Sequence, residues 1–188
     1  MPHGFWGRLL EVDLSTGRSR VIEVDQQVYR MFIGGRGLAT WLLWRRLGER
    51  WESIDPLGPE NILLALTGPM TGYYPGARLC ISGKSPQNNG VVGSTLGTEV
   101  AIELKAAGYD GVVITGASKD PVYLYIEDDK VELRDASKIW GKGSRETWKL
   151  IMEDTKPDYT KSGATTPPAF IYICLLYTSD AADELDGV

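Results

Sequence analysis

The chain has 188 residues, of which 43% are hydrophobic, and its formal net charge is −5. This length allows one large domain or two small ones with a real hydrophobic core. The Lys and Arg residues are interleaved with acidic residues, so the sequence does not predict a basic patch that would bind nucleic acid. No stretch approaches the roughly 20 apolar residues of a membrane helix. The N-terminus also lacks a signal-peptide pattern, so we expect a cytoplasmic protein.

In chain order the predicted elements are strands over residues 5–12 and 19–24, helices over 26–32 and 38–47, strands over 62–66, 78–82 and 91–92, a helix over 98–107, strands over 111–115, 122–126 and 130–134, and a helix over 144–154. Asp25 and Ser144 are placed to cap the helices that follow them, and Gly108 is placed to end one. Strands outnumber helices and follow one another as hairpins. This pattern predicts an α+β domain with mostly antiparallel sheets.

The domain is expected to occupy residues 1–157, because helix and strand periodicity disappears over 158–188. Within this tail, residues 174–184 (CLLYTSDAADE) match the translation of a transposon adaptor used to build sequencing libraries. We therefore expect a spurious tail, read past the end of a DNA fragment; the alternative is a natural flexible tail. The tail holds five acids and one lysine, so residues 1–157 carry a net charge of only −1.

Metal-ligating and nucleophilic residues are few. The chain has two cysteines, Cys80 and Cys174, and one histidine, His3. Neither cysteine has a neighbouring Cys or His, so no zinc site or iron–sulfur cluster is expected from this chain alone. Cys80 and Ser94 also lack a nearby His that would activate them, so no catalytic residue is predicted.

Glycine-rich turns separate the short predicted strands between residues 67 and 97. Such turns are typical of backbone that lies close to a phosphate-bearing ligand. Arg78 stands in an otherwise apolar strand just after the turn at 75–76. Its guanidinium either pairs with a carboxylate inside the fold or reaches a bound anion, and residue type alone leaves both open. Lys84 is predicted to be a solvated turn residue.

Two glycine-rich segments are expected to lead into helices. They are GGRG at 34–37 and GSTLG at 93–97. Amides at a helix N-terminus can receive an anion. The alternatives are a tight turn that requires positive φ at the first segment and a capped helix start at the second.

Eight motifs share their order and spacing with one family. They are FWGR (5–8), DLSTG (13–17), GGRGLA (34–39), DPLGPEN (55–61), TGPMTG (67–72), GKSP (83–86), ELKAAGYD (103–110) and RDASKIWG (134–141). As a series over about residues 4–153, they resemble the N-terminal domain of the aldehyde ferredoxin oxidoreductases. Each motif is unspecific alone, and the series carries the resemblance.

The resemblance implies a tungsten or molybdenum enzyme that oxidises aldehydes to carboxylic acids and passes electrons to ferredoxin through a [4Fe–4S] cluster. In this family two pterins hold the metal, and a magnesium ion bridges their phosphates. The N-terminal domain is the base of this bis-pterin cofactor, while later domains supply the cluster cysteines and the substrate cavity. We expect this chain to lack those domains and to be inactive alone. The oligomeric state of the parent enzyme stays open, with a homodimer as the candidate.

Carried over by motif, three residues are implied to bind the cofactor: Arg78, Thr95 and Gly97. Arg78 would contact the pterin phosphate region, and Gly97 would let the chain approach the pterin. Thr95 stands where relatives often have Asn, and its backbone carbonyl would ligate the magnesium. The alternative to this enzyme fragment is a free-standing α+β module that binds an anion or a partner protein without catalysis.

Overall fold

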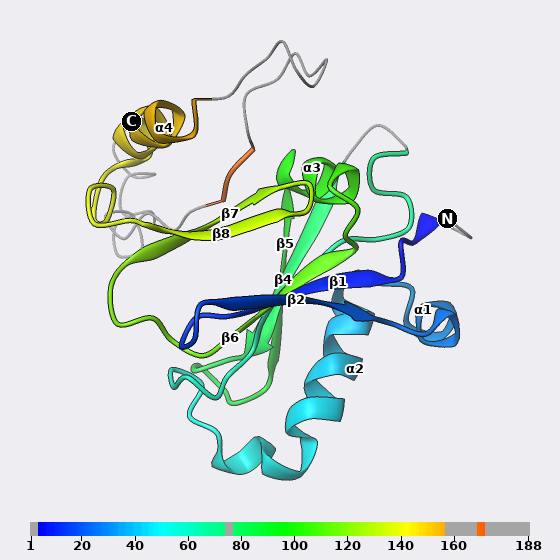
Figure 1. Ribbon diagram of the computed structural model, residues 1–188. Coiled ribbons are helices and arrows are strands. Elements are labelled where there is room, and N and C mark those ends of the chain that lie inside the picture. Colours follow the sequence, from blue (N-terminus) through cyan, green and yellow to red (C-terminus); the bar gives the residue numbers. More distant parts are fainter. Residues whose placement is uncertain (1–3, 74–76, 157–168, 172–188) are drawn as a thin grey trace, which may run out of the picture. The chain divides into compact units, whose positions relative to one another are not determined.

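The computed structural model describes residues 4–73, 77–156 and 169–171. Its elements are β1 (Arg8–Asp13), β2 (Arg18–Glu23), α1 (Gln26–Phe32), α2 (Gly35–Leu47), the 3-10 helix η2 (Gly48–Ser53), β3 (Leu63–Leu66), β4 (Arg78–Lys84), β5 (Val91–Gly97), α3 (Val100–Ala106), β6 (Gly111–Thr115), β7 (Val122–Glu127), β8 (Lys130–Asp135) and α4 (Ser144–Thr155) (Figure 1). None of the helices in these ranges is long and apolar enough to cross a membrane. The predicted tail lies outside the described residues, apart from 169–171.

The chain divides into two units. The first contains Met1–Lys119 and Leu124–Leu133, and the second contains Asp120–Tyr123 and Arg134–Val188. All the strands of the larger sheet, with the helices α1, α2 and α3, belong to the first unit, and α4 belongs to the second.

The larger sheet has six strands in the order β2-β1-β6-β3-β4-β5, and β7 pairs with β8. Only the β1–β6 pair is parallel among the neighbouring pairs of the larger sheet, and the others are antiparallel. The predicted α+β class with mostly antiparallel sheets is therefore confirmed. The parallel pair was not predicted, because alternation along one strand does not specify a partner far away in the sequence.

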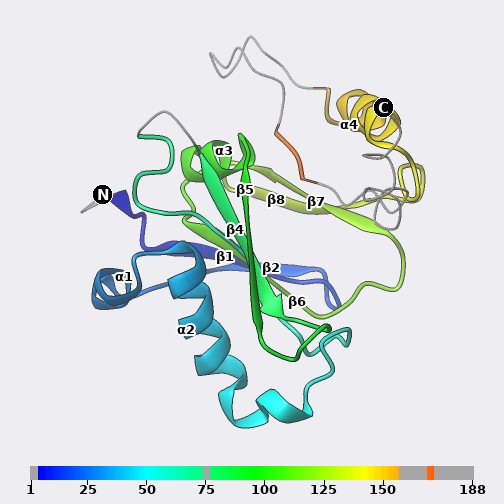
Figure 2. The same cartoon turned by 180° about the vertical axis from the view of Figure 1, so that it is seen from behind.

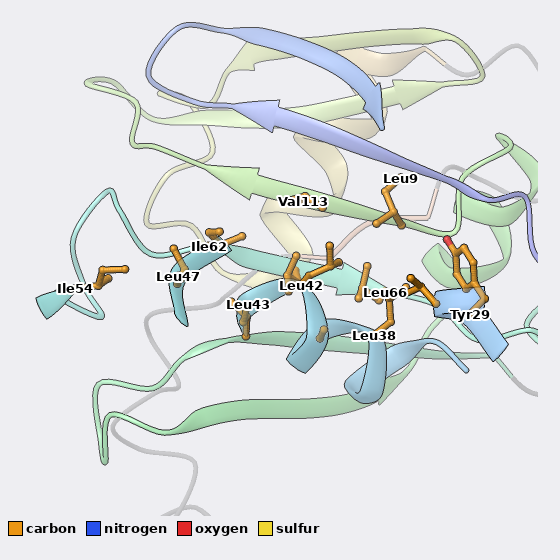
Figure 3. Close-up of a cluster of buried hydrophobic side chains, with 13 residues drawn as sticks. Leu9, Tyr29, Leu38, Leu42, Leu43, Leu47, Ile54, Ile62, Leu66 and Val113 are labelled. Carbon is orange, nitrogen blue, oxygen red and sulfur yellow. The ribbon is translucent and has the colours of Figure 1, made fainter. Parts of the chain in front are cut away.

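One face of the sheet packs against α2. Side chains alternate between the two faces of a strand, which places Leu64 and Leu66 of β3 on this face. They pack with Leu38 and Leu42 of α2, whose apolar residues recur at helical spacing. Figure 3 shows Leu38, Leu42 and Leu66 gathered in one cluster with residues of β1, β6 and α1. The cluster packs α2 against β3.

The opposite face of the sheet carries a second apolar cluster. Leu10 of β1, Val112 of β6 and Leu79 of β4 lie there with Ala101 and Leu104 of α3. The helix α3 lies beside β4 and β5 in both views (Figures 1 and 2). Leu79 of β4 is fully buried in this second cluster, and α2 also contacts β4.

The N-terminal segment is held by a buried ion pair. The Lys105 ammonium lies 2.5 Å from a carboxylate oxygen of Asp110, and the two side chains are 7% and 1% exposed. Asp110 also accepts hydrogen bonds from the amides of Trp6 and Gly7, at 3.1 and 2.7 Å. These bonds draw the chain away from strand pairing, so β1 begins at Arg8 and not at the predicted residue 5.

Lys84 corrects one prediction. Its side chain is not solvated but buried, with 3% exposed at the end of β4. The ammonium donates to the carbonyls of Trp51 and Ile54, at 2.5 and 2.7 Å, and lies over the Trp51 ring. These carbonyls belong to the 3-10 helix and the residue after it, and the sequence of a turn does not reveal such distant acceptors.

Two predicted helix caps have different outcomes. The Asp25 carboxylate accepts from the Gln27 amide at 2.7 Å, so Asp25 caps α1 as predicted. Ser144 is the first residue of α4 and not its cap, because Gly143 holds that position without a side-chain hydrogen bond. The helix itself is still formed over nearly the predicted range.

Candidate functional site

A cavity of about 600 Å³ lies in the first unit, where the start of α2 and the loop after β3 meet β4 and β5. It is lined by Ile33, Gly34, Gly35, Arg36, Leu66, Thr67, Gly68, Pro69, Met70, Thr71, Arg78, Cys80 and Thr95. Three of the glycine-rich motifs singled out in the sequence thus meet around one space. The turn at 75–76 lies outside the described residues.

The β4–β5 ladder positions the predicted cofactor residues. Arg78 pairs with Gly97, and Cys80 pairs with Thr95. Directly opposed residues of an antiparallel pair share a face, as do alternate residues along a strand. Arg78, Cys80 and Thr95 all line the cavity. Gly97 is not among the lining residues, but it lies on the same face, directly opposite Arg78.

The segment 93–97 corrects a prediction. It is not a loop that presents free amides at a helix start, because it forms most of β5 and pairs with β4. The helix α3 begins three residues later, at Val100, where the Thr98 hydroxyl accepts from the Val100 amide at 3.2 Å. The segment contributes a strand face to the cavity.

The turn before α2 favours one of the two interpretations of GGRG, namely a tight turn that requires positive φ. Gly34 and Gly35 have φ values of 120° and 49°, which favour glycine. A Cβ on Gly34 would lie 2.7 Å from the Thr67 carbonyl oxygen. The Gly35 amide donates to that same oxygen at 2.9 Å, so it is already engaged. These glycines allow α2 to start close to the loop after β3.

The charged residues that line the cavity are two arginines, Arg36 and Arg78, and no carboxylate is among the lining residues. Arg78 is exposed, and within the described ranges it makes no ion pair or hydrogen bond. Of the two roles left open for Arg78, pairing with an internal carboxylate is therefore not observed in this part of the chain. A guanidinium in such a place suits a phosphate or carboxylate ligand.

The residues present offer backbone, not side-chain, ligands for a cation at this site. Among the described residues no group of three or more His, Cys, Asp or Glu side chains could hold a metal ion. Thr95 lies on β5, which is the edge strand of the sheet. Every second carbonyl of an edge strand points away from its neighbour and is free to accept from or ligate another group.

Sequence reasoning missed two features of the cavity. Cys80 lines it with Arg78, and the two-residue spacing of a strand would have placed them on one face. Arg36 was considered only as part of a glycine turn, although its guanidinium reaches across to β5 and donates to the Gly93 carbonyl at 2.6 Å. Nothing in the sequence alone indicates that contact, because it joins residues 57 positions apart.

The family model described as aldehyde ferredoxin oxidoreductase, N-terminal domain, matches residues 9–168. The aliphatic sulfonate oxidoreductase, WOR-like subunit, of Pyrococcus furiosus is 50% identical over 91% of this chain and 28% of its own length. The tungsten-containing aldehyde ferredoxin oxidoreductase of the same organism is 40% identical over 88% of this chain and 27% of its own.

Among solved structures, the chain is similar to the active site complex BamBC of benzoyl coenzyme A reductase in complex with 1,5-dienoyl-CoA. The TM-score is 0.76 at 37% identity, over 83% of this chain and 24% of that one. The chain thus spans about a quarter of the length of each of these relatives.

Proposed function

Because the chain belongs to the aldehyde ferredoxin oxidoreductase family, whose N-terminal domain it matches, we propose that it forms part of the seat of a tungsten or molybdenum bis-pterin cofactor. The observation that carries the proposal is the exposed Arg78 guanidinium in a cavity whose described lining residues include no carboxylate. Phosphate groups carry the opposite charge and accept the hydrogen bonds that a guanidinium donates. The residues present therefore fit a phosphate-bearing ligand.

Each predicted residue has a distinct role in this proposal. Arg78 binds phosphoryl oxygens of the pterin, and Gly97, directly opposite, leaves the space beside that guanidinium free of a side chain. The Thr95 carbonyl would help to hold the magnesium ion, a role supported by its place on the edge strand. When bound, the metal–pterin group supplies the two-electron redox chemistry. The residues of this chain bind and orient it.

We propose further that the parent protein is a cytoplasmic oxidoreductase that converts an aldehyde and water to a carboxylic acid. Its electrons pass to ferredoxin through a [4Fe–4S] cluster held by later domains. The name of the tungsten-containing relative supports this activity. The chain described here, about a quarter of that length, is expected to be inactive alone. A homodimer of the parent remains part of the proposal.

A second substrate class has one observation in its favour. The relative that is 50% identical is named an aliphatic sulfonate oxidoreductase, so an aliphatic sulfonate is the alternative substrate of the parent. The named relatives differ in substrate although they share this domain. Substrate choice is therefore expected to depend on residues outside it.

The test begins with the source DNA that follows codon 157. The proposal predicts a second glycine–arginine loop and then a Cys-x-x-Cys-x-x-x-Cys motif there. The longer product should contain tungsten or molybdenum by elemental analysis and reduce a viologen dye with an aldehyde or an aliphatic sulfonate. A stop codon soon after residue 157, or a product with neither metal, would favour the free-standing anion-binding module instead.

A further inference from the structure

Arg36 reaches the edge strand of the sheet, β5, with its side chain. It is the second residue of α2, and its Nη2 donates to the Gly93 carbonyl of β5 at 2.6 Å. A Cβ built on Gly93 would lie 2.5 Å from the Arg36 Nε and 3.2 Å from its Cδ. Only glycine at position 93 therefore leaves room for the guanidinium in this place. Gly93 is two residues from Thr95, on the cavity face of the strand.

Most of the hydrogen-bonding capacity of Arg36 is unused. A guanidinium has five N–H donors, and the Gly93 carbonyl accepts from only one of them. Within the described ranges Arg36 makes no ion pair, and its side chain is exposed where it lines the cavity with Arg78. The wall thus presents two positive charges that no carboxylate of the lining residues neutralises.

We propose that Arg36 is a second anion-binding residue of this site and contacts phosphoryl oxygens of the same ligand that Arg78 binds. The inference rests on the proposed function, because it takes the ligand to be phosphate-bearing. Gly93 acts as a positioning residue, since its carbonyl and its missing side chain fix the guanidinium at the cavity wall. A ligand with at least two negative charges matches the two guanidiniums.

A purely structural role for Arg36 makes a different prediction. If the hydrogen bond to Gly93 only ties α2 to β5, its loss lowers stability and leaves ligand affinity unchanged. If Arg36 also binds the anion, affinity falls even in a variant that is fully folded. Affinity and unfolding temperature must therefore be measured on the same protein samples.

The experiment titrates the purified 188-residue chain with inorganic pyrophosphate by calorimetry at low ionic strength. The variants are Arg36→Gln, Arg78→Gln and, as a matched control, Arg45→Gln, which removes an exposed charge from the last turn of the same helix. We expect Arg36→Gln and Arg78→Gln each to weaken binding about tenfold, as the loss of a charge-assisted hydrogen bond predicts. Arg45→Gln should change the pyrophosphate affinity by less than about twofold. Arg36→Lys replaces Arg36→Gln if the latter does not fold.

A fourth variant, Gly93→Ala, keeps the charge of Arg36 but displaces its guanidinium. It should also weaken pyrophosphate binding. The double variant of Arg36→Gln with Gly93→Ala should lose little more affinity than Arg36→Gln alone. If Arg36→Gln binds like Arg45→Gln while Arg78→Gln loses affinity, this inference is wrong and the proposed function stands. If the unsubstituted 188-residue chain does not bind pyrophosphate, both are wrong.

Discussion

Arg78 and Gly97 are direct partners in the antiparallel ladder between β4 and β5. Opposed residues of such a ladder project side chains to the same face, about 5 Å apart at Cβ. Since Gly97 has no side chain, the volume beside the Arg78 guanidinium is left to whatever binds there. Its φ is not in the left-handed region, so backbone conformation does not require glycine at this position. The close approach of a ligand would explain why glycine stands at position 97, whereas the backbone conformation does not require it.

Replacing Gly97 by Val tests this relationship. Among the described residues, a Cβ at Gly97 would contact only the Ala77 carbonyl oxygen, at an ordinary 3.8 Å, and Val suits a strand. We expect the free energy of unfolding to change by less than about 0.5 kcal/mol, while pyrophosphate affinity falls about tenfold because the new side chain fills the space beside Arg78. Calorimetric titration and urea denaturation measure the two effects. Ser94→Val, on the opposite face of β5, is the control, and equal affinity in both variants would contradict the role of Gly97.

Replacing Lys84 by Met should destabilise the fold without any effect on the cavity. The carbonyls of Trp51 and Ile54 lose their buried donor. Each unsatisfied buried group costs about 1–3 kcal/mol, so we expect a loss of roughly 2–4 kcal/mol. Urea denaturation measures it, with the exposed Lys119→Met as the control at less than about 0.5 kcal/mol. A loss no larger than that of the control would show that Lys84 contributes little.

Glu11 should make stability depend on pH. Burial alone would raise the pKa of this carboxyl, but hydrogen bonds from Arg46 and Arg20 outweigh burial and hold the pKa below its usual value. A lowered folded-state pKa stabilises the fold above the unfolded pKa of about 4.3, and the effect is lost as pH falls through the folded-state pKa.

The variant Glu11→Gln should therefore unfold about 1–3 kcal/mol more easily at pH 7. Arg20 is largely exposed, so most of this effect comes from Arg46. The difference in unfolding free energy between Glu11→Gln and the unsubstituted chain should shrink as the pH falls below about 4. Urea midpoints from pH 3 to pH 7 measure it. A difference that stays constant over this range would assign the effect to packing and not to charge.

The buried pair of Lys105 and Asp110 should show strong coupling. Asp110→Asn leaves the ammonium buried without its carboxylate, and Lys105→Met leaves the carboxylate without its cation. Each single variant should lose about 3–5 kcal/mol, whereas the double variant should lose clearly less than the sum. A double-mutant cycle by urea denaturation measures the coupling. Simple additivity would mean that the two charges do not stabilise each other.

Local signals predicted most elements of the fold. The Asp25 cap and the alternation in β1 are encoded within a few residues, so their positions follow from the sequence. The strand start at Arg8 was missed because Asp110, about a hundred positions away, binds the preceding amides. Lys84 was misjudged for the same reason, since its acceptors lie more than 29 positions away. A pattern within a few residues cannot indicate a contact partner that is distant in the sequence and comes close only in the folded chain.

The sequence by itself determined the family of this chain, the α+β class and the candidate residues Arg78, Thr95 and Gly97, because motifs and periodicity are local properties. Only the tertiary structure decided which of these residues share a face, how GSTLG forms a strand, and where Arg36 lies against Gly93. The physical reason is that register and long-range hydrogen bonds depend on the packing of α2 and α3 against the sheet. That packing places the guanidiniums of Arg36 and Arg78 in one cavity wall, where the described lining residues include no carboxylate.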